Sequence, residues 1–280
     1  MGEAQNGEYS VIGESLNSIW FVGCGNMGGA ILQAWFDQGL DPAKVTVIKP
    51  HVSKLPGGLQ SQTDYPEGPS PDLVLLAMKP YQLNDVAAEL APRVSDNSRI
   101  VSVLAGTELG ILRKAFPKAG EVIRLMPNMA VTVAKSPMIL ISETDDADLK
   151  NQMNELFSPL GKPEWLENEG QMHIATALSG SGPAFVFRFI DALAVSAAGL
   201  GMDKEQAARL AVAMVDGAAT LAAASDVSPG PLADQVASPN GVTRKGLDVL
   251  DADGRVNALL HDVLKAAMER NREMAEEAKA

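Results

Sequence analysis

The sequence predicts an α/β protein in which a parallel-sheet domain precedes an all-α domain. Short apolar runs alternate with amphipathic stretches from residue 18 to about residue 141, with the spacing of strand, crossover helix and strand. These runs are apolar on both faces, which is typical of parallel strands covered by helices on either side. After residue 169, long Ala- and Leu-rich stretches of helical period replace them. We therefore predict a mobile tail over residues 1–17, a sheet domain over 18–169 and a helical domain over 170–280.

Six apolar runs are the predicted strands. They cover residues 19–22, 45–48, 73–77, 100–104, 122–125 and 138–141. The segment between the second and third runs, residues 59–71, is rich in Pro, Gly and Ser, so we predict a surface loop there.

The second domain is predicted to consist of long helices. One helix covers residues 170–198, ended by Gly199 and Gly201, and Asp203 with Gln206 caps the next helix. The apolar face of that next helix consists of Ala207, Leu210, Met214, Val215, Ala218 and Leu221. Ser228 followed by a proline starts a further helix, and two more cover residues 242–250 and 255–279. So much small-residue helical surface predicts close helix packing, and our hypothesis is that this packing occurs between subunits.

Composition excludes several classes of protein. The net charge of −12 and the pI near 4.7 argue against a nucleic acid or an anionic membrane as partner. The single cysteine, Cys24, excludes an internal disulfide and fits the reducing cytoplasm. The uncharged run over residues 170–187 approaches membrane-spanning length, but its polar residues favour a buried helix. The polar first eighteen residues resemble neither a secretory signal nor a transit peptide.

A glycine-rich motif follows the first predicted strand. Gly23, Gly25 and Gly28, with Asn26 and Met27 between the last two, form Gly-x-Gly-x-x-Gly at the start of a helix. The glycines allow a tight turn, close approach of a pyrophosphate and close helix packing, while the helix N-terminus favours an anion. This context predicts a dinucleotide site, although a Gly-rich turn without a ligand is the alternative.

The end of the second predicted strand indicates which dinucleotide binds. NAD sites usually place a carboxylate there to accept from the ribose 2′-hydroxyl. This chain instead has Lys49, His51, Ser53 and Lys54, whose chemistry suits a 2′-phosphate. We therefore predict NADPH over NADH; a solvated basic loop is the alternative.

The run over residues 176–185 has an unusual composition for a helix. It contains two glycines, two serines and Pro183, which removes a backbone donor and leaves the carbonyl of Ser179 without its usual partner. Either a ligand approaches this backbone closely, or the run is a tight helix crossing with a kink.

Taken together, these motifs resemble the pyrroline-5-carboxylate reductase family, which makes proline. The resemblance covers nearly all of the chain after the tail, and it rests on residues 21–28, 76–80, 100–106, 124–128, 176–185 and 238–243. It implies a Rossmann-like first domain, an all-helical second domain that dimerises, often within larger rings, and hydride transfer from NAD(P)H to a cyclic imine.

The resemblance also implies roles for individual residues. The loop matching Gly241, Val242 and Thr243 holds the substrate carboxylate, and the Thr243 hydroxyl meets the ring nitrogen. The implied catalytic residues are Thr243, Lys79 and Thr176, and the implied substrate-binding residues also include Ser179, Gly180, Ser181, Asp226 and Ser238. The implied cofactor-binding residues are Gly23, Gly25, Asn26, Met27, Gly28, Lys49, Ser53, Lys54, Ala77, Lys79, Pro80 and Asn128. No metal is implied.

Two other functions stay open on the residues alone. A related oxidoreductase would act on another imine or on a 3-hydroxy acid, but hydroxy-acid enzymes of this kind use a lysine on the long helix, and residues 170–202 contain none. A non-catalytic NADP-binding regulator would not need the hydroxyls of Thr176 and Ser179. The chain departs from the family pattern at Met129, Ala130 and Asn240, which leaves a shifted substrate preference open.

Overall fold

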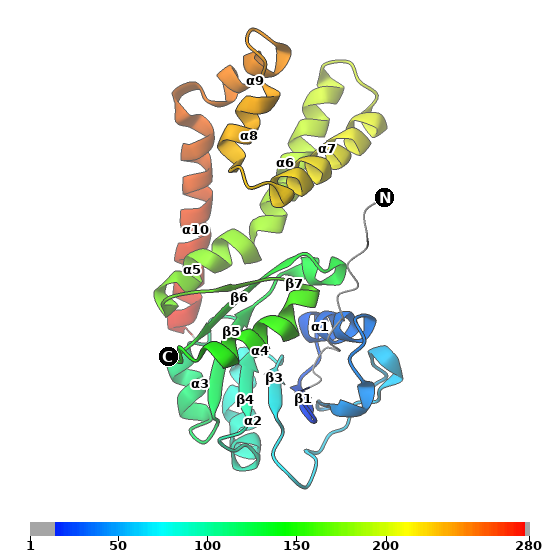
Figure 1. The fold of residues 1–280 in the computed structure, drawn as a ribbon, viewed down its shortest axis with the longest axis vertical. Helices are drawn as coiled ribbons and strands as arrows, with labels where there is room; N and C mark the ends of the chain where they lie inside the picture. Colours follow the sequence, from blue (N-terminus) through cyan, green and yellow to red (C-terminus); the bar gives the residue numbers. More distant parts are fainter. Residues whose placement is uncertain (1–14, 278–280) are drawn as a thin grey trace. The chain divides into compact units, whose positions relative to one another are not determined.

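The computed structural model describes residues 15–277, which contain a seven-stranded sheet (Figure 1). Its strand order is β2-β1-β3-β4-β5-β6-β7, and neighbouring strands are parallel except for the antiparallel pair β5 and β6. The strands are β1 (Ile19–Val22), β2 (Val45–Ile48), β3 (Leu73–Leu76), β4 (Arg99–Ser102), β5 (Glu121–Met126), β6 (Ser136–Ser142) and β7 (Gly161–Trp165). The predicted α/β class and six of the seven strands are confirmed.

Sequence patterns missed β7 and the direction of β6. The β7 sequence Gly-Lys-Pro-Glu-Trp is polar and contains a proline, because an edge strand pairs on one side only and can be partly solvated. A short connection of residues 127–135 joins β5 to β6, which is too short for a crossover helix and therefore reverses the chain direction.

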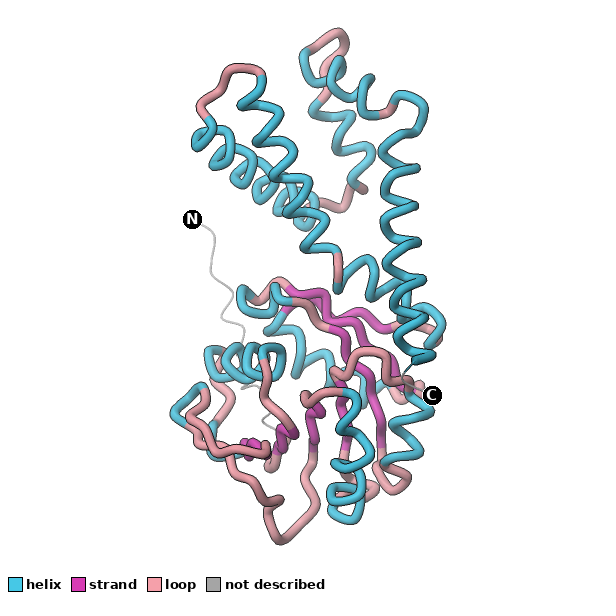
Figure 2. The backbone as a smooth tube through the Cα atoms, turned by 180° about the vertical axis from the view of Figure 1, so that it is seen from behind, coloured by secondary structure: helices cyan, strands magenta, loops and turns pink. Residues whose placement is uncertain are grey.

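Helices cover both faces of the sheet (Figure 2), and the sheet separates the hydrophobic core into two clusters. On one face, α1 (Asn26–Asp37) and α4 (Ala147–Phe157) pack against alternate strand residues. On the other face, α2 (Leu83–Leu90) and α3 (Leu109–Ala115) cover the remaining ones. Trp35 joins α1 to α4, because its ring stacks on Phe157 at 5.7 Å and its Nε1 donates to the carbonyl of Leu156 at 3.0 Å.

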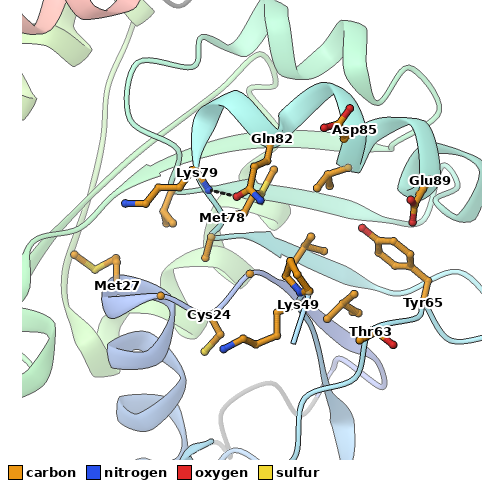
Figure 3. A pocket seen from close by; sticks show the side chains of 18 of the residues that line it. Cys24, Met27, Lys49, Thr63, Tyr65, Met78, Lys79, Gln82, Asp85 and Glu89 are labelled. Carbon is orange, nitrogen blue, oxygen red and sulfur yellow. Dashed lines mark hydrogen bonds between the residues drawn. The ribbon is translucent and has the colours of Figure 1, made fainter. Parts of the chain in front are cut away.

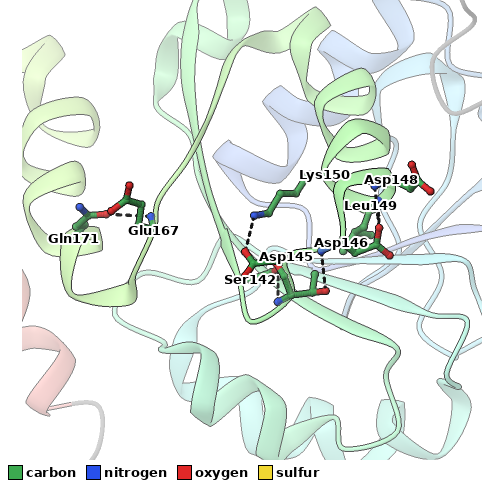
Figure 4. A network of polar contacts seen from close by, with 9 residues as sticks. Ser142, Asp145, Asp146, Asp148, Leu149, Lys150, Glu167 and Gln171 are labelled. Carbon is green, nitrogen blue, oxygen red and sulfur yellow. Dashed lines mark hydrogen bonds and ion pairs between the residues drawn. The ribbon is translucent and has the colours of Figure 1, made fainter.

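The start of α4 is fixed by acidic side chains (Figure 4). Asp146 caps the helix, since its Oδ1 accepts from the N–H of Asp148 at 2.9 Å and from that of Leu149 at 3.3 Å. Lys150 Nζ pairs with Asp145 Oδ1 at 3.1 Å. The acidic turn before α4 is thus accounted for by capping.

The predicted tail and the predicted surface loop each contain a buried residue. The predicted tail covers residues 1–17, of which 1–14 lie outside the described residues. Of the other three, Leu16 is buried and the N–H of Asn17 donates to Asp72 Oδ2 at 2.6 Å. The boundary at residue 17 stays a prediction. Within the loop over residues 59–71, Ser61 is buried and accepts from the N–H of Ser53 at 2.9 Å. Buried polar groups in loops need such partners.

The remaining helices are α5 (Met172–Ala175), α6 (Gly182–Gly199), α7 (Lys204–Ala224), α8 (Pro229–Val236), α9 (Val242–Leu250) and α10 (Arg255–Glu277). The prediction of one helix over 170–198 was wrong. A π-helical segment, Thr176–Gly180, separates α5 from α6, and Pro183 lies in the first turn of α6. Glycine and proline interrupt the α-helical hydrogen bonds here, as their costs in a helix interior require.

The chain forms two compact units. Of the described residues, 15–180 together with 268–277 form one unit, and Ser181–Ala267 forms the other. The end of α10 belongs to the first unit, where Asn271 Nδ2 lies 3.0 Å from His173 Nδ1. The predicted domain bounds of 18–169 and 170–280 stay a prediction.

The second unit exposes much of its apolar surface in the single chain. None of the eighteen residues of α6 is buried, so in one chain alone the prediction of a buried helix over 170–187 is wrong for residues 182–187, which belong to α6. The exposed fractions are 68% for Phe187, 50% for Leu210 and 71% for Leu221. Within the described residues, two helical stretches, Glu169–Gly199 and Lys204–Ala224, are long and apolar enough to cross a membrane by length and composition alone.

Candidate functional site

A cavity of about 840 Å³ opens at the carboxyl ends of β1, β2 and β3 (Figure 3). The chain runs from β1 to β2 on one side and continues with β3 on the other side of β1. Open parallel sheets bind ligands at such a change of direction in the strand order. Its lining includes Val22, Gly23, Cys24, Gly25, Asn26, Met27, Ile48, Lys49, Pro50, Thr63, Tyr65, Ala77, Met78, Lys79, Gln82, Asp85, Val86, Glu89 and Val103.

The three glycines of the motif have three different local requirements. Gly23 has φ +81°, and a Cβ there would lie 2.6 Å from the backbone nitrogen of Met78. A Cβ on Gly25 would meet no described heavy atom within 4 Å, so the space beside this glycine is open to a ligand. A Cβ on Gly28 would lie 2.9 Å from the Cβ of Ala77, so the close packing of α1 on the sheet requires glycine at this position. These requirements correspond to the tight turn, the pyrophosphate approach and the helix packing of a dinucleotide site.

The N-terminus of α1 supplies an anion site within this cavity. Gly25 is its N-cap residue, the first turn contains no acidic residue, and no described side chain caps the first amides. Asn26 and Met27 follow in the cavity lining. A twelve-residue helix with free N–H groups and a positive dipole end is well suited to a pyrophosphate.

Lys49 brings the basic loop to the cavity. Its side chain lines the cavity, and its Nζ donates to Ser53 Oγ at 3.1 Å. Burial raises the pKa of the Cys24 thiol, and the charge of Lys49 opposes that rise in part. The thiol therefore stays protonated near neutral pH, and the positive charge of Lys49 is available to an anion.

An aromatic and acidic end of the cavity was missed by sequence reasoning. Tyr65 lies against Trp20, with ring centroids 6.0 Å apart, and below the guanidinium of Arg93 at 5.2 Å. Burial raises the pKa of Tyr65 to about 12, so its hydroxyl stays neutral. Asp85 and Glu89 come from α2 and lie near this end (Figure 3).

A helical spacing in the sequence could have identified these residues. Gln82, Asp85, Val86 and Glu89 recur at spacings of three and four residues after β3. The last three therefore share one face of α2, and Gln82 is the N-cap residue of this helix. Thr63 and Tyr65 carry no such signal, because only the folding of the loop brings them to the cavity.

Seven of the predicted cofactor-binding residues line the cavity. They are Gly23, Gly25, Asn26, Met27, Lys49, Ala77 and Lys79. The other five, Gly28, Ser53, Lys54, Pro80 and Asn128, lie outside its described lining. Met27 and Lys79 stand at the end opposite Tyr65 and Glu89 (Figure 3).

The predicted substrate wall in the first unit is the π-helical segment. Thr176 Oγ1 donates to the carbonyl of Met172 at 2.7 Å, and Ser179 Oγ donates to that of Ala175 at 2.6 Å. Both hydroxyl protons therefore bond to backbone, which leaves the hydroxyl oxygens able to accept. The carbonyl of Ser179 accepts from Asn128 Nδ2 at 2.8 Å instead of from a helix N–H.

The other predicted substrate residues belong to the second unit. Gly241 is the N-cap of α9, its N–H donates to the carbonyl of Ser238 at 2.9 Å, and a Cβ there would collide with Ser238 Oγ. Val242 and Thr243 begin the helix, so their N–H groups are at its positive end. Asn240 has φ +58°, a left-handed conformation that asparagine tolerates in place of glycine. Ser181 is the N-cap of α6, and Asp226 is exposed in the loop before α8.

Comparison with known proteins identifies the family. A family model for pyrroline-5-carboxylate reductase dimerisation matches residues 169–274, and one for coenzyme F420-dependent NADP oxidoreductases matches residues 18–106. The pyrroline-5-carboxylate reductase of Methanosarcina acetivorans is 34% identical over 265 residues, covering 91% of this chain and 97% of that protein. The chain belongs to the pyrroline-5-carboxylate reductase family.

Other members of the pyrroline-5-carboxylate reductase family are also similar to this chain over most of its length. The Pseudomonas aeruginosa protein is 31% identical over 92% of this chain and 97% of its own length. The solved Coxiella burnetii reductase is 32% identical with a TM-score of 0.85, covering 93% of this chain and 99% of that one. A Plasmodium falciparum pyrroline carboxylate reductase solved with NADP bound is 24% identical with a TM-score of 0.75, covering 94% and 99%, and so shares the fold.

Family membership also explains the exposed helices. The dimerisation model covers both stretches whose length and composition would suit a membrane. The chain is therefore an oligomer-forming NAD(P)-dependent oxidoreductase.

Proposed function

We propose that this protein reduces 1-pyrroline-5-carboxylate to L-proline with NADPH, the last step of proline biosynthesis. The observation that carries the proposal is the cavity at the strand ends, in which each glycine of the motif meets its own requirement. Family membership supplies the reaction, because the curated relatives are pyrroline-5-carboxylate reductases.

The cavity lining supports one direction for the bound dinucleotide. The pyrophosphate binds the free amides of Gly25, Asn26 and Met27 at the start of α1. Lys49, supported by Ser53 and Lys54, holds the 2′-phosphate at the end of β2, which favours NADPH over NADH. The adenine then lies toward Tyr65 and α2, and the nicotinamide toward Met27 and Lys79.

Substrate binding is assigned to hydroxyls and backbone amides. The N–H groups of Val242 and Thr243 hold the substrate carboxylate at the N-terminus of α9, next to Gly241, whose own N–H is bonded to the carbonyl of Ser238. The Thr243 hydroxyl hydrogen-bonds the ring nitrogen, and Asp226 and Ser238 support this loop. Thr176 and the segment Ser179, Gly180 and Ser181 contribute the remaining polar wall.

The reaction is a hydride transfer to a carbon–nitrogen double bond. When bound, NADPH supplies the hydride that the substrate ring carbon accepts. The ring nitrogen carries a proton before the transfer, because an iminium accepts hydride more readily than a neutral imine. Hydride addition makes the carbon–nitrogen bond single and leaves the proton on the amine of proline, so that NADP⁺ is the other product. Thr243 holds that N–H, and Lys79 orients the cofactor.

The assembly is proposed to be a homodimer formed by the apolar faces of α6 and α7, with larger rings built from such dimers. The exposed apolar side chains of both helices support this proposal. We place the enzyme in the cytoplasm, where its single cysteine stays reduced.

A three-way assay tests the function. NADPH oxidation is followed with pyrroline-5-carboxylate, NADP⁺ reduction is followed with a 3-hydroxy acid, and both are measured without substrate. Turnover with pyrroline-5-carboxylate alone is expected. Turnover of the hydroxy acid would instead favour the related dehydrogenase, and NADPH binding without turnover would favour a regulator.

The role of Thr243 has its own test. Thr243→Ala removes the hydroxyl and should lower kcat/KM for pyrroline-5-carboxylate at least tenfold, about 1.4 kcal/mol of transition-state stabilisation. Thr144→Ala, in the loop before α4, makes the same change away from the cavity and should leave kcat/KM unaltered. Equal kinetics for the two variants would reject the assignment of Thr243.

A further inference from the structure

The π-helical segment contains a carbonyl that its own helix cannot satisfy. In an α-helix the carbonyl of residue 179 would accept from the N–H of residue 183, but Pro183 has no N–H. In a π-helix it would accept from residue 184, but the N–H of Ala184 donates to the carbonyl of Ser181 at 3.0 Å. A partly buried carbonyl without a donor is costly. In this structure Asn128 Nδ2, at 2.8 Å, takes the place of the missing donor.

The amide of Asn128 is held in one orientation. Its Oδ1 accepts from the N–H of Ala130 at 2.8 Å, and its own N–H donates to Ser136 Oγ at 2.9 Å. The side chain is largely buried, with 7% exposed, and Ser136 is fully buried. Since Oδ1 must accept from Ala130, Nδ2 must face Ser179 as a donor. The contact therefore depends on the amide and not on size alone.

We propose that Asn128 is a positioning residue that fixes the π-helical segment, in place of the cofactor-binding role expected from the sequence. It follows β5, so it ties the carboxyl end of the sheet to Thr176–Gly180. Asn128 compensates for Pro183: the proline removes a backbone donor from the helix, and the Asn128 amide donates to the Ser179 carbonyl instead. The effect on catalysis rests on the proposed function, in which Thr176–Gly180 belongs to the substrate site.

Asn128→Asp is the first test. Aspartate keeps the acceptor for Ala130 but replaces the donor with an oxygen facing the Ser179 carbonyl. Hydrogen exchange of the amides over residues 176–185 should become at least tenfold faster. KM for pyrroline-5-carboxylate should rise at least tenfold, while Kd for NADPH stays within twofold. Asn97→Asp adds the same charge at an exposed loop and should change none of these values.

Pro183→Ala provides a second, independent measurement. It supplies an N–H at residue 183 that can donate to Ser179, so the same Asn128→Asp change should cost less in this background. The double variant should exchange more slowly over 176–185 and melt at a higher temperature than Asn128→Asp alone. This comparison holds even when the single variant is poorly stable.

The outcomes separate the possible roles of Asn128. Unchanged exchange over 176–185 in Asn128→Asp would overturn the proposal, and so would additive effects of the two substitutions. A tenfold weaker Kd for NADPH with unchanged exchange would also overturn it, and would make Asn128 a cofactor ligand. Faster exchange with unchanged kcat and KM would contradict the effect on catalysis, and would remove Thr176–Gly180 from the proposed substrate site.

Discussion

The two compact units of this protein bury their apolar side chains in different ways. In the first unit, Trp35, Phe116 and Phe157 are fully buried between the sheet and its helices. In the second, Phe187 and Leu221 are largely exposed, and only Ala207, Ala211 and Ala237 of its described apolar residues are buried. Fully burying one large apolar side chain is worth about 1.5–3 kcal/mol. The first unit therefore carries its own core, whereas the second leaves most of its apolar side chains exposed in the single chain.

A glycine pair tests the first unit and has the largest expected effect. Gly23→Ala forces a Cβ against the backbone of Met78 at a positive φ, which should cost about 3 kcal/mol or more. NADPH turnover should fall at least a thousandfold, with a lower Tm. Gly25→Ala meets open space, so its Tm should stay within about 2 °C while KM for NADPH rises at least tenfold. Equal Tm values measured by calorimetry for both variants would contradict the local requirements assigned to these glycines.

A charge on α7 tests the second unit. Leu210→Glu places a carboxylate on the face that the partner should cover, and should raise the Kd of the dimer at least a hundredfold, about 2.7 kcal/mol. Val52→Glu makes the same kind of change at a similarly exposed position of the first unit. Sedimentation should show monomers for Leu210→Glu and unchanged dimers for Val52→Glu. The interface assignment would fail if Leu210→Glu remained dimeric at micromolar concentration.

Lys49 tests how the first unit selects NADPH over NADH. Lys49→Gln removes the charge opposite the 2′-phosphate, so KM for NADPH should rise about tenfold, or about 1.4 kcal/mol, while KM for NADH changes little. Lys118→Gln, at an exposed turn, serves as the control. Parallel steady-state assays with the two cofactors provide the measurement, and equal losses with both would reject the 2′-phosphate assignment.

The smallest effect concerns Cys24, the single cysteine of the chain. Burial raises the pKa of its thiol, and a thiol reacts with iodoacetamide as the thiolate. The alkylation rate should be several-fold below that of free cysteine at about pH 8, and should keep rising beyond about pH 8.5, where an ordinary thiol titrates. NADP⁺ should slow the reaction further, because Cys24 lines the cavity. Faster alkylation than free cysteine at neutral pH would contradict the burial of this thiol.

Local signals in the sequence predicted the first unit well. The strand Ile19–Val22, the glycine motif and the start of α1 depend on neighbouring residues, and all three appear at their predicted positions. The edge strand β7 was missed because solvation on one side removes the apolar pattern. Tyr65 reaches the cavity only through the folding of its loop, which no local pattern records.

In the second unit, local signals predicted helix positions but not helix burial. Helix periodicity predicted α9 over residues 242–250 as the structure has it, and Asp203 caps α7 as expected, its Oδ1 accepting from the N–H of Gln206. The polar residues of the run over 170–187 predicted a buried helix, but the part of this run in α6 is exposed, because composition does not reveal whether its own chain or a partner covers a helix. The odd composition around Ser179 did predict a carbonyl without a helix donor, but not that Asn128 would be its partner.

The most direct test of the central claim follows the hydride itself. The holoenzyme is incubated with pyrroline-5-carboxylate and NADPH that carries deuterium at C4 of the nicotinamide on the transferred face, and the product is analysed by mass spectrometry and NMR. We expect one proline for each NADPH consumed, with one deuterium at ring C5. Consumption of NADPH without deuterated proline would contradict it.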